Sequence, residues 1–430
     1  MQKVNASIIT IGDELLIGQT IDTNSAFIAQ ELNKIGVWVK RRVAVGDVYD
    51  DIWKALDEEG KESDIIIITG GLGPTADDIT KPLLCNYFGG KLVVNEEVLT
   101  HVKYLFEKVY RRPGPMLERN LKQAEVPDVC IVLHNARGTA PGMWFTPQPP
   151  KGGVQHPDKK VFVSLPGVPH EMKGLIMDEV IPRLLKEFTM PAILHRTIFT
   201  SGLGESMIAE MIKDFETALP AHIKLAYLPG FGMVRLRLTA LGENKEQLEI
   251  EMNGQFEQLK KLVKDYLVTD VDDEMQVVIG QLLKARGKTM ATAESCTGGY
   301  IAHLITSVPG SSAYYKGSVV SYANEVKENI LNVKHDTLLS VGAVSEETVK
   351  ELVKGAIEKL NVDYAIATSG IMGPDGGTEE KPVGMVWLAA GNKNNIVTKL
   401  IHVRFDRERN IRQTAYMALD FLRKFILTNS

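Results

Sequence analysis

The chain has 430 residues, of which 44% are apolar and 24% charged, and its formal net charge is −5. This length allows two or three soluble domains, and the acidic balance argues against broad nucleic-acid binding driven by phosphate neutralisation. The three cysteines are scattered and show neither a disulfide framework nor metal-ligand spacing, so a reducing cytoplasm is the expected compartment. The N-terminus lacks the apolar core of a signal peptide and no apolar run is long enough to span a bilayer, so no membrane association is expected.

Apolar strand-like runs alternate with amphipathic helical patterns over the first third of the chain. Strands are predicted over 6–11, 37–45 and 64–69, and helical patterns over 15–32, starting in earnest near Thr23, and over 52–59. The third strand contains four consecutive isoleucines, which is typical of a strand buried inside a parallel sheet. This alternation predicts an α/β layered fold with right-handed crossovers.

The sharpest motif of this part is a glycine-rich turn, TGGLGPTADD at residues 69–78, between the third strand and a helix. Glycine lets backbone N–H groups approach an anion, and a helix N-terminus adds partial positive charge. Ligands of open α/β sheets bind beyond the carboxyl ends of the strands, so the turn predicts phosphate binding. The alternative is a tight turn with favourable acidic charges in the following helix. The residues assigned to this nucleotide site are Gly70, Gly71, Gly73, Thr75, Asn135, Pro166 and Gly167.

Four acidic residues near these strand ends are candidates for sharing a divalent cation that bridges phosphate oxygens. They are Glu14, Asp47, Asp77 and Asp78. A surface or capping role is the alternative for each of them.

The middle of the chain reads as a small α+β segment. Strands are predicted over 195–200 and 234–239, and helices over 207–212 and 245–262. An acidic linker at 270–274 leads into the last part of the chain.

In the last part, the sequence AESCTGG at residues 293–299 joins a predicted strand to a helical pattern. Ser295 is therefore expected where a strand turns into a helix, a place that suits a nucleophile. The unpaired N–H groups of the first helical turn would then hold a developing oxyanion. The alternative is that Ser295 or Thr297 caps the helix. Cys296 is a competing nucleophile without an evident partner base.

A serine nucleophile needs a base, and none of the histidines of this part lies in a glycine-rich or turn motif. A lysine can serve if burial lowers its pKa. Lys327 and Tyr322 lie in a segment that could return beside the Ser295 turn, although a solvated helix lysine is the alternative.

A second glycine-rich loop, residues 369–378, follows a buried strand and offers many backbone N–H groups to a phosphate or an amide. Arg407 and Arg412 are candidates for gripping the same phosphate, with surface charge as the alternative. The substrate-binding set assigned to this part is Thr297, Gly298, Gly299, Gly370, Gly373, Gly376, Gly377, Thr378, Arg407 and Arg412.

These motifs carry a resemblance to one family. Residues 12–18 (GDELLIG), 69–78 and 165–172 (LPGVPHEM) resemble the molybdopterin-binding-type domain of the CinA family, the competence/damage-inducible proteins. The stretch around Ser295 resembles the deamidase domain that ends the same family. The resemblance covers essentially the whole chain, with the motifs in the family's order.

The resemblance implies an α/β multidomain fold. It implies a MogA/MoaB-like three-layer α/β domain over 1–188, a small α+β KH-like domain over 189–268 and an α/β amidase domain over 274–430. A KH module grips nucleic acid through a G-x-x-G loop, which the middle segment lacks. A spacer or dimerisation role is therefore expected there, with a homodimer and without direct nucleic-acid binding.

The resemblance also implies two activities. The family's deamidase domain hydrolyses the carboxamide of nicotinamide mononucleotide to nicotinate mononucleotide and ammonia without a cofactor. Its serine, tyrosine and lysine match Ser295, Tyr322 and Lys327, with the serine as nucleophile, the lysine as base and the tyrosine relaying the proton or orienting the lysine. The family's first domain is associated with hydrolysis of ADP-ribose assisted by a divalent metal ion, and together the two activities would recycle breakdown products of NAD.

Three alternatives to this bifunctional hydrolase remain open. The first domain would bind molybdopterin without catalysis, the chain would act as a partner protein in DNA uptake or repair, or its sites would bind nucleotides as signals.

Overall fold

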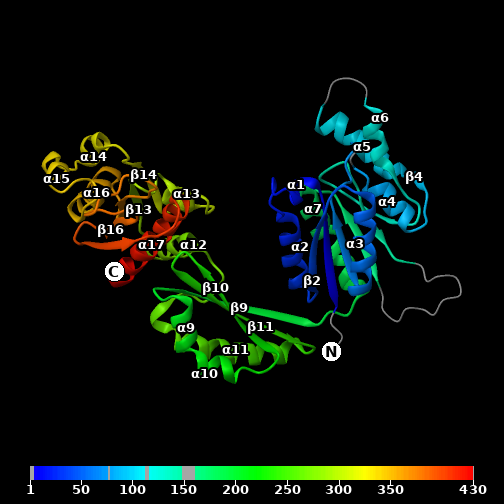
Figure 1. Ribbon diagram of the computed structural model, residues 1–430, viewed down its shortest axis with the longest axis horizontal. Coiled ribbons are helices and arrows are strands. Elements are labelled where there is room, and N and C mark those ends of the chain that lie inside the picture. Colours follow the sequence, from blue (N-terminus) through cyan, green and yellow to red (C-terminus); the bar gives the residue numbers. More distant parts are fainter. Residues whose placement is uncertain (1–3, 76–77, 112–115, 148–159, 430) are drawn as a thin grey trace. The chain divides into compact units, whose positions relative to one another are not determined.

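The computed structural model describes residues 4–75, 78–111, 116–147 and 160–429 (Figure 1). Its contacts divide the chain into two compact units, Met1–Leu194 with Ala240–Glu251, and His195–Thr239 with Met252–Ser430. None of the described helices is long and apolar enough to cross a lipid bilayer.

The first unit is built on a six-stranded sheet with the strand order β2-β1-β3-β8-β7-β6. The first four of these strands run parallel, and β7 and β6 are antiparallel to their neighbours. The strands are β1 (Asn5–Ile11), β2 (Trp38–Val45), β3 (Ile65–Thr69), β6 (Ile131–Leu133), β7 (Gly142–Phe145) and β8 (Val161–Leu165). The parallel α/β arrangement predicted from the alternating pattern is therefore confirmed.

Helices cover both faces of this sheet because the central strands are apolar on both sides. Ile65 and Ile67 pack into a cluster with residues of α2 and α7, whereas Ile66 and Ile68 pack into one with residues of α3 and α4. The helices of this unit are α1 (Asp13–Leu16), α2 (Thr23–Lys34), α3 (Tyr49–Glu62), α4 (Thr80–Tyr87), α5 (Glu96–Tyr104), α6 (Glu118–Leu121), α7 (Pro169–Leu175) and α8 (Ile181–Glu187), with shorter π and 3-10 turns at Leu105–Val109, Lys122–Ala124 and Ile176–Val180.

The helical pattern at 15–32 is divided in the structure. Four residues form α1, and α2 begins only at Thr23, because the Asp22 side chain caps it by accepting the Ser25 N–H at 2.9 Å. A small separate lobe follows α4, where β4 (Leu92–Val94) pairs with β5 (Glu125–Pro127).

The middle segment of the chain forms a four-stranded sheet of order β10-β11-β9-β12, which confirms its predicted α+β character. Its elements are β9 (Ala192–Ser201), α9 (Glu205–Met211), α10 (Lys213–Ala218), β10 (Ile223–Gly230), β11 (Met233–Gly242), α11 (Lys245–Leu262), a 3-10 turn (Lys264–Tyr266) and β12 (Leu267–Thr269). The sequence pattern missed β10 and β12.

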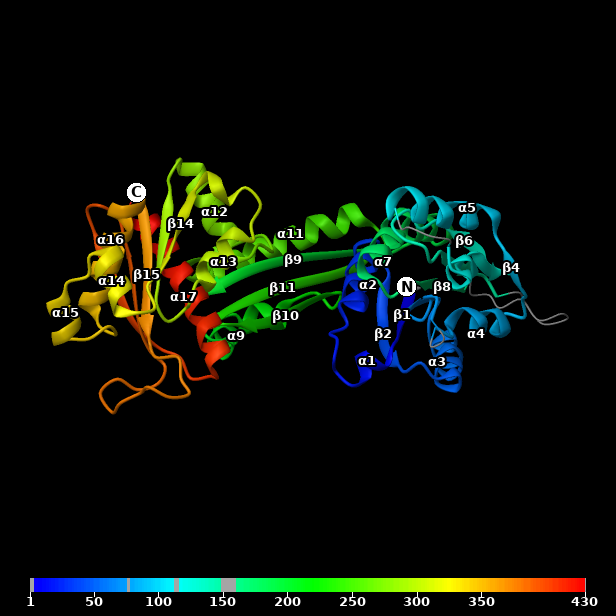
Figure 2. The same cartoon turned by 90° about the horizontal axis from the view of Figure 1, so that it is seen from above.

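The last part of the chain forms a five-stranded sheet of order β14-β13-β15-β16-β17 (Figure 2). Strand β13 lies between β14 and β15 and runs parallel to both, so the carboxyl ends of these three strands share one edge. The elements are α12 (Met275–Arg286), β13 (Met290–Glu294), α13 (Tyr300–Thr306), a 3-10 turn (Ser311–Ala313), β14 (Tyr315–Val320), α14 (Asn324–Leu331), α15 (His335–Ser340), α16 (Glu346–Leu360), β15 (Tyr364–Gly370), β16 (Met385–Gly391), β17 (Ile396–His402) and α17 (Arg407–Thr428).

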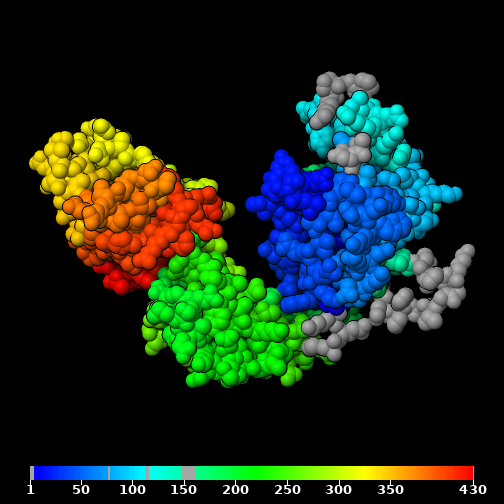
Figure 3. Space-filling view, viewed as in Figure 1, coloured from blue at the N-terminus to red at the C-terminus, as the bar shows by residue number. Residues whose placement is uncertain are grey.

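Two hydrophobic clusters fill the two faces of this sheet. One contains residues of α12, α13 and α17, and the other contains residues of α14 and α16. The space-filling view shows the resulting packed body in yellow to red (Figure 3).

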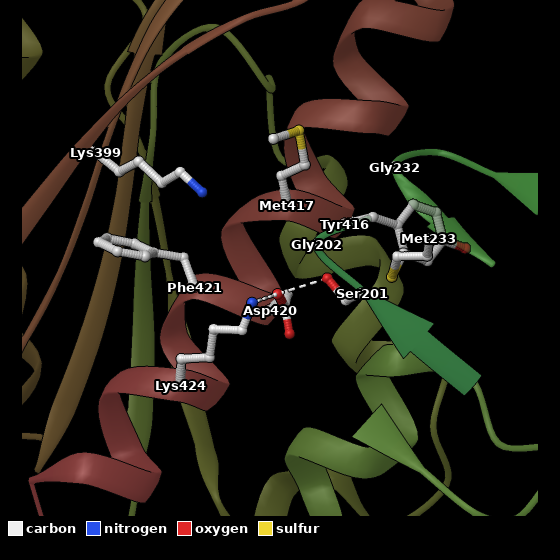
Figure 4. A pocket seen from close by; sticks show the side chains of 10 residues that line it. All are labelled: Ser201, Gly202, Gly232, Met233, Lys399, Tyr416, Met417, Asp420, Phe421 and Lys424. Carbon is white, nitrogen blue, oxygen red and sulfur yellow. Dashed lines mark hydrogen bonds and ion pairs between the residues drawn. The ribbon is translucent and has the colours of Figure 1, made fainter. Parts of the chain in front are cut away.

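The middle sheet is attached to α17 by a buried polar contact. Ser201, at the end of β9, donates a hydrogen bond from its hydroxyl to the Asp420 carboxylate at 2.7 Å (Figure 4). Asp420 also accepts from Lys424 at 2.9 Å and Arg423 at 2.8 Å. The cavity of about 70 Å³ beside this contact includes none of the predicted catalytic residues.

Candidate active site

Ser295 lies directly after β13, at the edge where three parallel strands end. Its N–H donates to the carbonyl of Thr368 in β15 at 3.0 Å, so the backbone stays attached to the sheet before it turns. The residue is 9% exposed, and the described residues offer no hydrogen-bond partner to its hydroxyl. The structure therefore leaves this hydroxyl available for chemistry.

The N-terminus of α13 differs from the prediction. The N–H groups of Gly299, Ile301 and Ala302 donate to the Glu294 side chain at 3.1, 3.0 and 2.8 Å. The expectation that unpaired amides of the first helical turn face the nucleophile was wrong, because an internal carboxylate caps them. Within the turn at residues 295–298, the amides of Cys296 and Thr297 have no hydrogen-bond partner among the described residues.

Lys327 is a buried side chain, not a solvated one. It projects from α14 with 1% of its surface exposed. Its Nζ donates to the carbonyl oxygens of Ser321 at 2.7 Å and Tyr322 at 3.1 Å. Burial lowers its pKa, an effect partly opposed by the negative charge of Glu325.

The parallel pairing of β13 and β14 brings Lys327 to the edge that carries Ser295. Glu294 is in register with Val320, and the next residue, Ser321, donates its N–H to the Glu294 carbonyl at 2.8 Å. Ser295 and Ser321 therefore follow paired positions on adjacent strands. The lysine amine lies against the Ser321 carbonyl at this same edge.

Tyr322 meets the lysine through its backbone. Its carbonyl accepts from Lys327, whereas its hydroxyl, on a side chain that is 65% exposed, accepts from Arg407 Nη2 at 3.2 Å. The described contacts do not join the Tyr322 hydroxyl to Lys327, which is the contact that a proton relay would use.

Arg407 reaches the second glycine-rich loop. Its Nη1 donates to the Gly373 carbonyl at 2.8 Å, so the guanidinium bridges this loop and Tyr322. Arg412 instead forms an exposed ion pair with Glu408 at 2.6 Å, which is the surface role given as its alternative.

Several predicted substrate-binding residues have internal partners. The Thr297 hydroxyl donates to Glu294 at 2.8 Å and lies 2.8 Å from the Thr368 hydroxyl. Thr378 closes a local turn with Lys381, donating its N–H at 2.9 Å and accepting with its hydroxyl at 3.0 Å. The loop glycines Gly373 and Gly376, like Gly298 and Gly299, take positive φ angles between 59° and 95°. These glycines shape the two turns.

Cys296 does not compete as a nucleophile. It is buried, and burial raises the pKa of its thiol to about 12. The thiol therefore stays protonated at neutral pH and fills space in the core.

In the first unit, the ends of β3 and β8 bring two predicted motifs together. Thr69 donates its hydroxyl to the Pro166 carbonyl at 3.1 Å, and Gly70 donates its N–H to the Leu165 carbonyl at 3.1 Å. Asn24, which the sequence reasoning did not assign to the site, donates to the Gly167 carbonyl at 2.7 Å. Asn24 could have been assigned to the site from its position in the first turn of α2, which faces the same strand ends.

Asn135, which was assigned to the nucleotide site, holds its own loop through internal hydrogen bonds. Its Nδ2 donates to the Ala140 carbonyl at 2.8 Å and to Glu171 at 2.6 Å, and its Oδ1 accepts the Arg137 N–H at 3.0 Å.

The predicted cluster of four acidic metal ligands does not form within the described residues, where no group of three or more candidate ligand side chains gathers. Asp78 closes the glycine turn by accepting the N–H groups of Gly73 at 2.8 Å and Thr75 at 2.9 Å. Asp47 accepts the N–H of Asp13 at 3.2 Å, beside Glu14. Asp77 lies outside the described residues. The described side chains thus do not fit a metal ion held by the protein alone.

Comparisons with known proteins match all three parts of the chain. Family models match residues 7–186 as a probable molybdopterin binding domain, 195–269 as a damage-inducible protein CinA KH domain and 272–426 as a CinA C-terminal domain. The chain is 48% identical to a CinA-like protein of Cytophaga hutchinsonii over 98% of both chains. It is 44% identical to one of Flavobacterium psychrophilum over 99% of both.

Among solved structures, it is similar to the competence damage-inducible protein A of Klebsiella pneumoniae. The two are 34% identical with a TM-score of 0.36, over 36% of this chain and 97% of that one. With a probable molybdopterin binding domain, a CinA KH domain and a CinA C-terminal domain in this order, the chain belongs to the CinA family of competence/damage-inducible proteins.

Proposed function

We propose that the C-terminal domain is a serine–lysine amidase that hydrolyses nicotinamide mononucleotide to nicotinate mononucleotide and ammonia. One observation carries this proposal: a buried lysine amine is fixed by two backbone carbonyls at the sheet edge that presents the unpartnered Ser295 hydroxyl. The substrate is inferred from the resemblance of the motifs to the family's deamidase domain.

The two carbonyls suit Lys327 to the role of base. A neutral amine has two N–H bonds and one lone pair. If the carbonyls of Ser321 and Tyr322 take the two N–H bonds, the lone pair points away from both. Burial lowers the pKa of Lys327, which raises the fraction of neutral amine near neutral pH.

In the proposed reaction, Ser295 Oγ attacks the carboxamide carbon and its proton passes to Lys327. The carbonyl oxygen becomes an oxyanion, for which the partnerless amides of Cys296 and Thr297 are the proposed donors. The C–N bond then breaks, Lys327 returns the proton and ammonia leaves. Water then attacks the acyl ester while Lys327 takes its proton. The bond between the acyl carbon and Ser295 Oγ breaks, and Lys327 passes the proton to Oγ, which restores the serine and the neutral amine and releases nicotinate mononucleotide.

Arg407 is the proposed phosphate ligand of this site. Its guanidinium already lies between the Gly373 carbonyl and the Tyr322 hydroxyl, so a phosphate near this loop would gain charge-assisted hydrogen bonds. The exposed ion pair of Arg412 with Glu408 favours Arg407 over Arg412 for this role.

The test is to incubate the full-length protein with nicotinamide mononucleotide in EDTA and to measure ammonia and nicotinate mononucleotide. We expect equal amounts of both, and a fall of at least about 10³-fold in kcat/KM for Ser295→Ala and for Lys327→Met. Lys316→Met, which changes an exposed lysine of β14, is the matched control and should keep full activity. Turnover that survives Ser295→Ala would refute the mechanism.

A second candidate function, hydrolysis of ADP-ribose by the first domain, is favoured by the convergence of its Thr69–Gly70 turn with Pro166 and Gly167. The described carboxylates do not form a metal cage, so a divalent cation would have to bind together with the substrate phosphates. AMP formation that requires added Mg²⁺ is the expected result. Tight binding of ADP-ribose or pterin without turnover would favour the non-catalytic binding module.

A further inference from the structure

We propose that Glu294 is the positioning residue of the nucleophile, acting on Ser295 through the turn that follows. This inference rests on the proposed amidase function, because it assumes that Ser295 attacks a substrate. The Glu294 side chain is fully buried, and the described residues give it no cationic partner. A buried carboxylate without a counter-charge is costly unless hydrogen bonds replace its water.

Six donors replace that water. The hydroxyls of Thr292, Thr297 and Ser318 donate at 3.1, 2.8 and 3.4 Å. The other three donors are the backbone amides at the start of α13, described above. Each carboxylate oxygen receives three of these six contacts, so both oxygens are needed as acceptors.

These contacts hold Ser295 from both sides. Before the serine, Glu294 is fixed within β13. After it, Thr297 is tied to the Glu294 carboxylate and to Thr368, the residue whose carbonyl also accepts the Ser295 N–H. The three-residue turn that carries the nucleophile is therefore anchored at each end by the same residue, through its backbone in β13 before the turn and through its carboxylate after it.

The same residue also connects to the base. The Glu294 carbonyl accepts the Ser321 N–H at 2.8 Å, and the Ser321 carbonyl accepts the Lys327 amine at 2.7 Å. The positions of the nucleophile and of the base therefore both depend on contacts with Glu294. The Glu294 side chain itself does not contact the reacting atoms.

Glu294→Gln separates positioning from folding. Glutamine keeps the shape of the side chain but replaces one acceptor oxygen with an NH₂ group. This group faces hydrogen-bond donors and cannot accept hydrogen bonds from them. The turn should shift, and a displacement of about 1 Å in a reacting group can reduce rate by about 10²-fold. We expect kcat to fall by about this factor, KM to stay within about threefold, and the pH at half-maximal activity to stay unchanged.

Asp420→Asn is the matched control, because Asp420 is another buried carboxylate of the same unit without contact to the Ser295 turn. It should lower thermal stability while keeping kcat per folded molecule. Thr297→Val and Thr297→Ser form a second pair: valine removes the hydroxyl that reaches Glu294, and serine retains it, so only the serine variant should restore kcat. This pair decides the proposal if Glu294→Gln fails to fold.

Labelling of Ser295 by a fluorophosphonate gives a readout that needs no nucleotide. We expect labelling in the wild-type protein and a rate at least about tenfold lower in Glu294→Gln. Unchanged kcat and labelling in folded Glu294→Gln, or equal activity of the two Thr297 variants, would overturn the inference. If the wild type labels but does not turn over nicotinamide mononucleotide, the proposed function fails, while the labelling rates still decide the role of Glu294.

Discussion

The amine of Lys327 and the carbonyl oxygen of Ser321 lie 2.7 Å apart, six residues from each other in the chain. Strand β14 ends just before Ser321 and α14 begins three residues later, so the chain folds back and places the lysine against the strand end that it has just left. A lysine in a buried helix position is thereby turned toward the sheet edge. In the proposed reaction, this geometry leaves the lone pair of the neutral amine available to accept the proton of Ser295.

Amidase activity should depend on the neutral form of Lys327. Burial lowers the pKa of this amine, so kcat/KM should rise with pH and reach half its maximum below pH 10.5, the value of an exposed lysine. The negative charge of Glu325 raises the same pKa, so Glu325→Gln should move the midpoint to lower pH. Rates of ammonia release from pH 6 to 11 measure both. A midpoint that moves to higher pH in Glu325→Gln would contradict the assignment.

Cys296→Ser should retain most of the activity. The thiol is buried and its pKa is raised to about 12, so the protein at pH 7.5 contains almost no thiolate at this position. We expect kcat/KM within about threefold of wild type and no inhibition by iodoacetamide in the folded protein, since thiol alkylation requires the thiolate. Inactivation that follows alkylation of Cys296, located by peptide mass, would instead make this cysteine part of the mechanism.

Arg407→Ala should raise KM far more than Arg412→Ala. Loss of a charge-assisted hydrogen bond costs about 1.5–3 kcal/mol, which corresponds to an increase in KM of roughly 10- to 100-fold. Arg412 pairs with Glu408 on the exposed surface, so its removal should change KM by less than about twofold. Comparison of nicotinamide mononucleotide with dephosphorylated nicotinamide riboside adds a control: the riboside should be insensitive to Arg407→Ala.

The stability of the first unit should rise with pH because of Lys81. This lysine of α4 is buried, its Nζ donates to the Gln123 carbonyl at 3.1 Å, and burial lowers its pKa to about 8. Between pH 8 and 10.5 the unfolded chain holds the proton that the native protein has lost, so the free energy of unfolding increases over this range, by roughly 3 kcal/mol for the full shift. Below pH 8 the native protein also holds the Lys81 proton, so the cost of burying the charged amine lowers the free energy of unfolding by its full amount.

Denaturant unfolding at pH 7.5 and pH 10.5 would measure this rise, with Lys81→Met as the variant that should lack it. Tryptophan fluorescence can be restricted to the first unit, because Trp387 is the only one of the four tryptophans outside it. A Trp387→Phe background therefore reports the unit that contains Lys81. An equal pH dependence in both proteins would show that Lys81 does not titrate over this range.

Local patterns in the sequence predicted the central strands of the first sheet and the helices between them, but missed strands such as β10 and β12. The four isoleucines at 65–68 form the buried centre of a parallel sheet, because a strand covered on both faces needs apolar residues at every position. Local polar signals were less specific. The carboxyl of Asp78 was a candidate metal ligand in the sequence, whereas in the structure it closes its own turn through Gly73 and Thr75.

The sequence by itself determined the family, the layered α/β architecture and the place of Ser295 between a strand and a helix, since periodicity and turn residues act over a few positions. Only the tertiary structure decided which polar groups stay unpaired. Glu294 collects donors from residues 292 to 318, and Lys327 becomes buried because α14 folds back against the sheet. Desolvation and hydrogen-bond pairing depend on every group that surrounds an atom, and a linear pattern does not contain those neighbours.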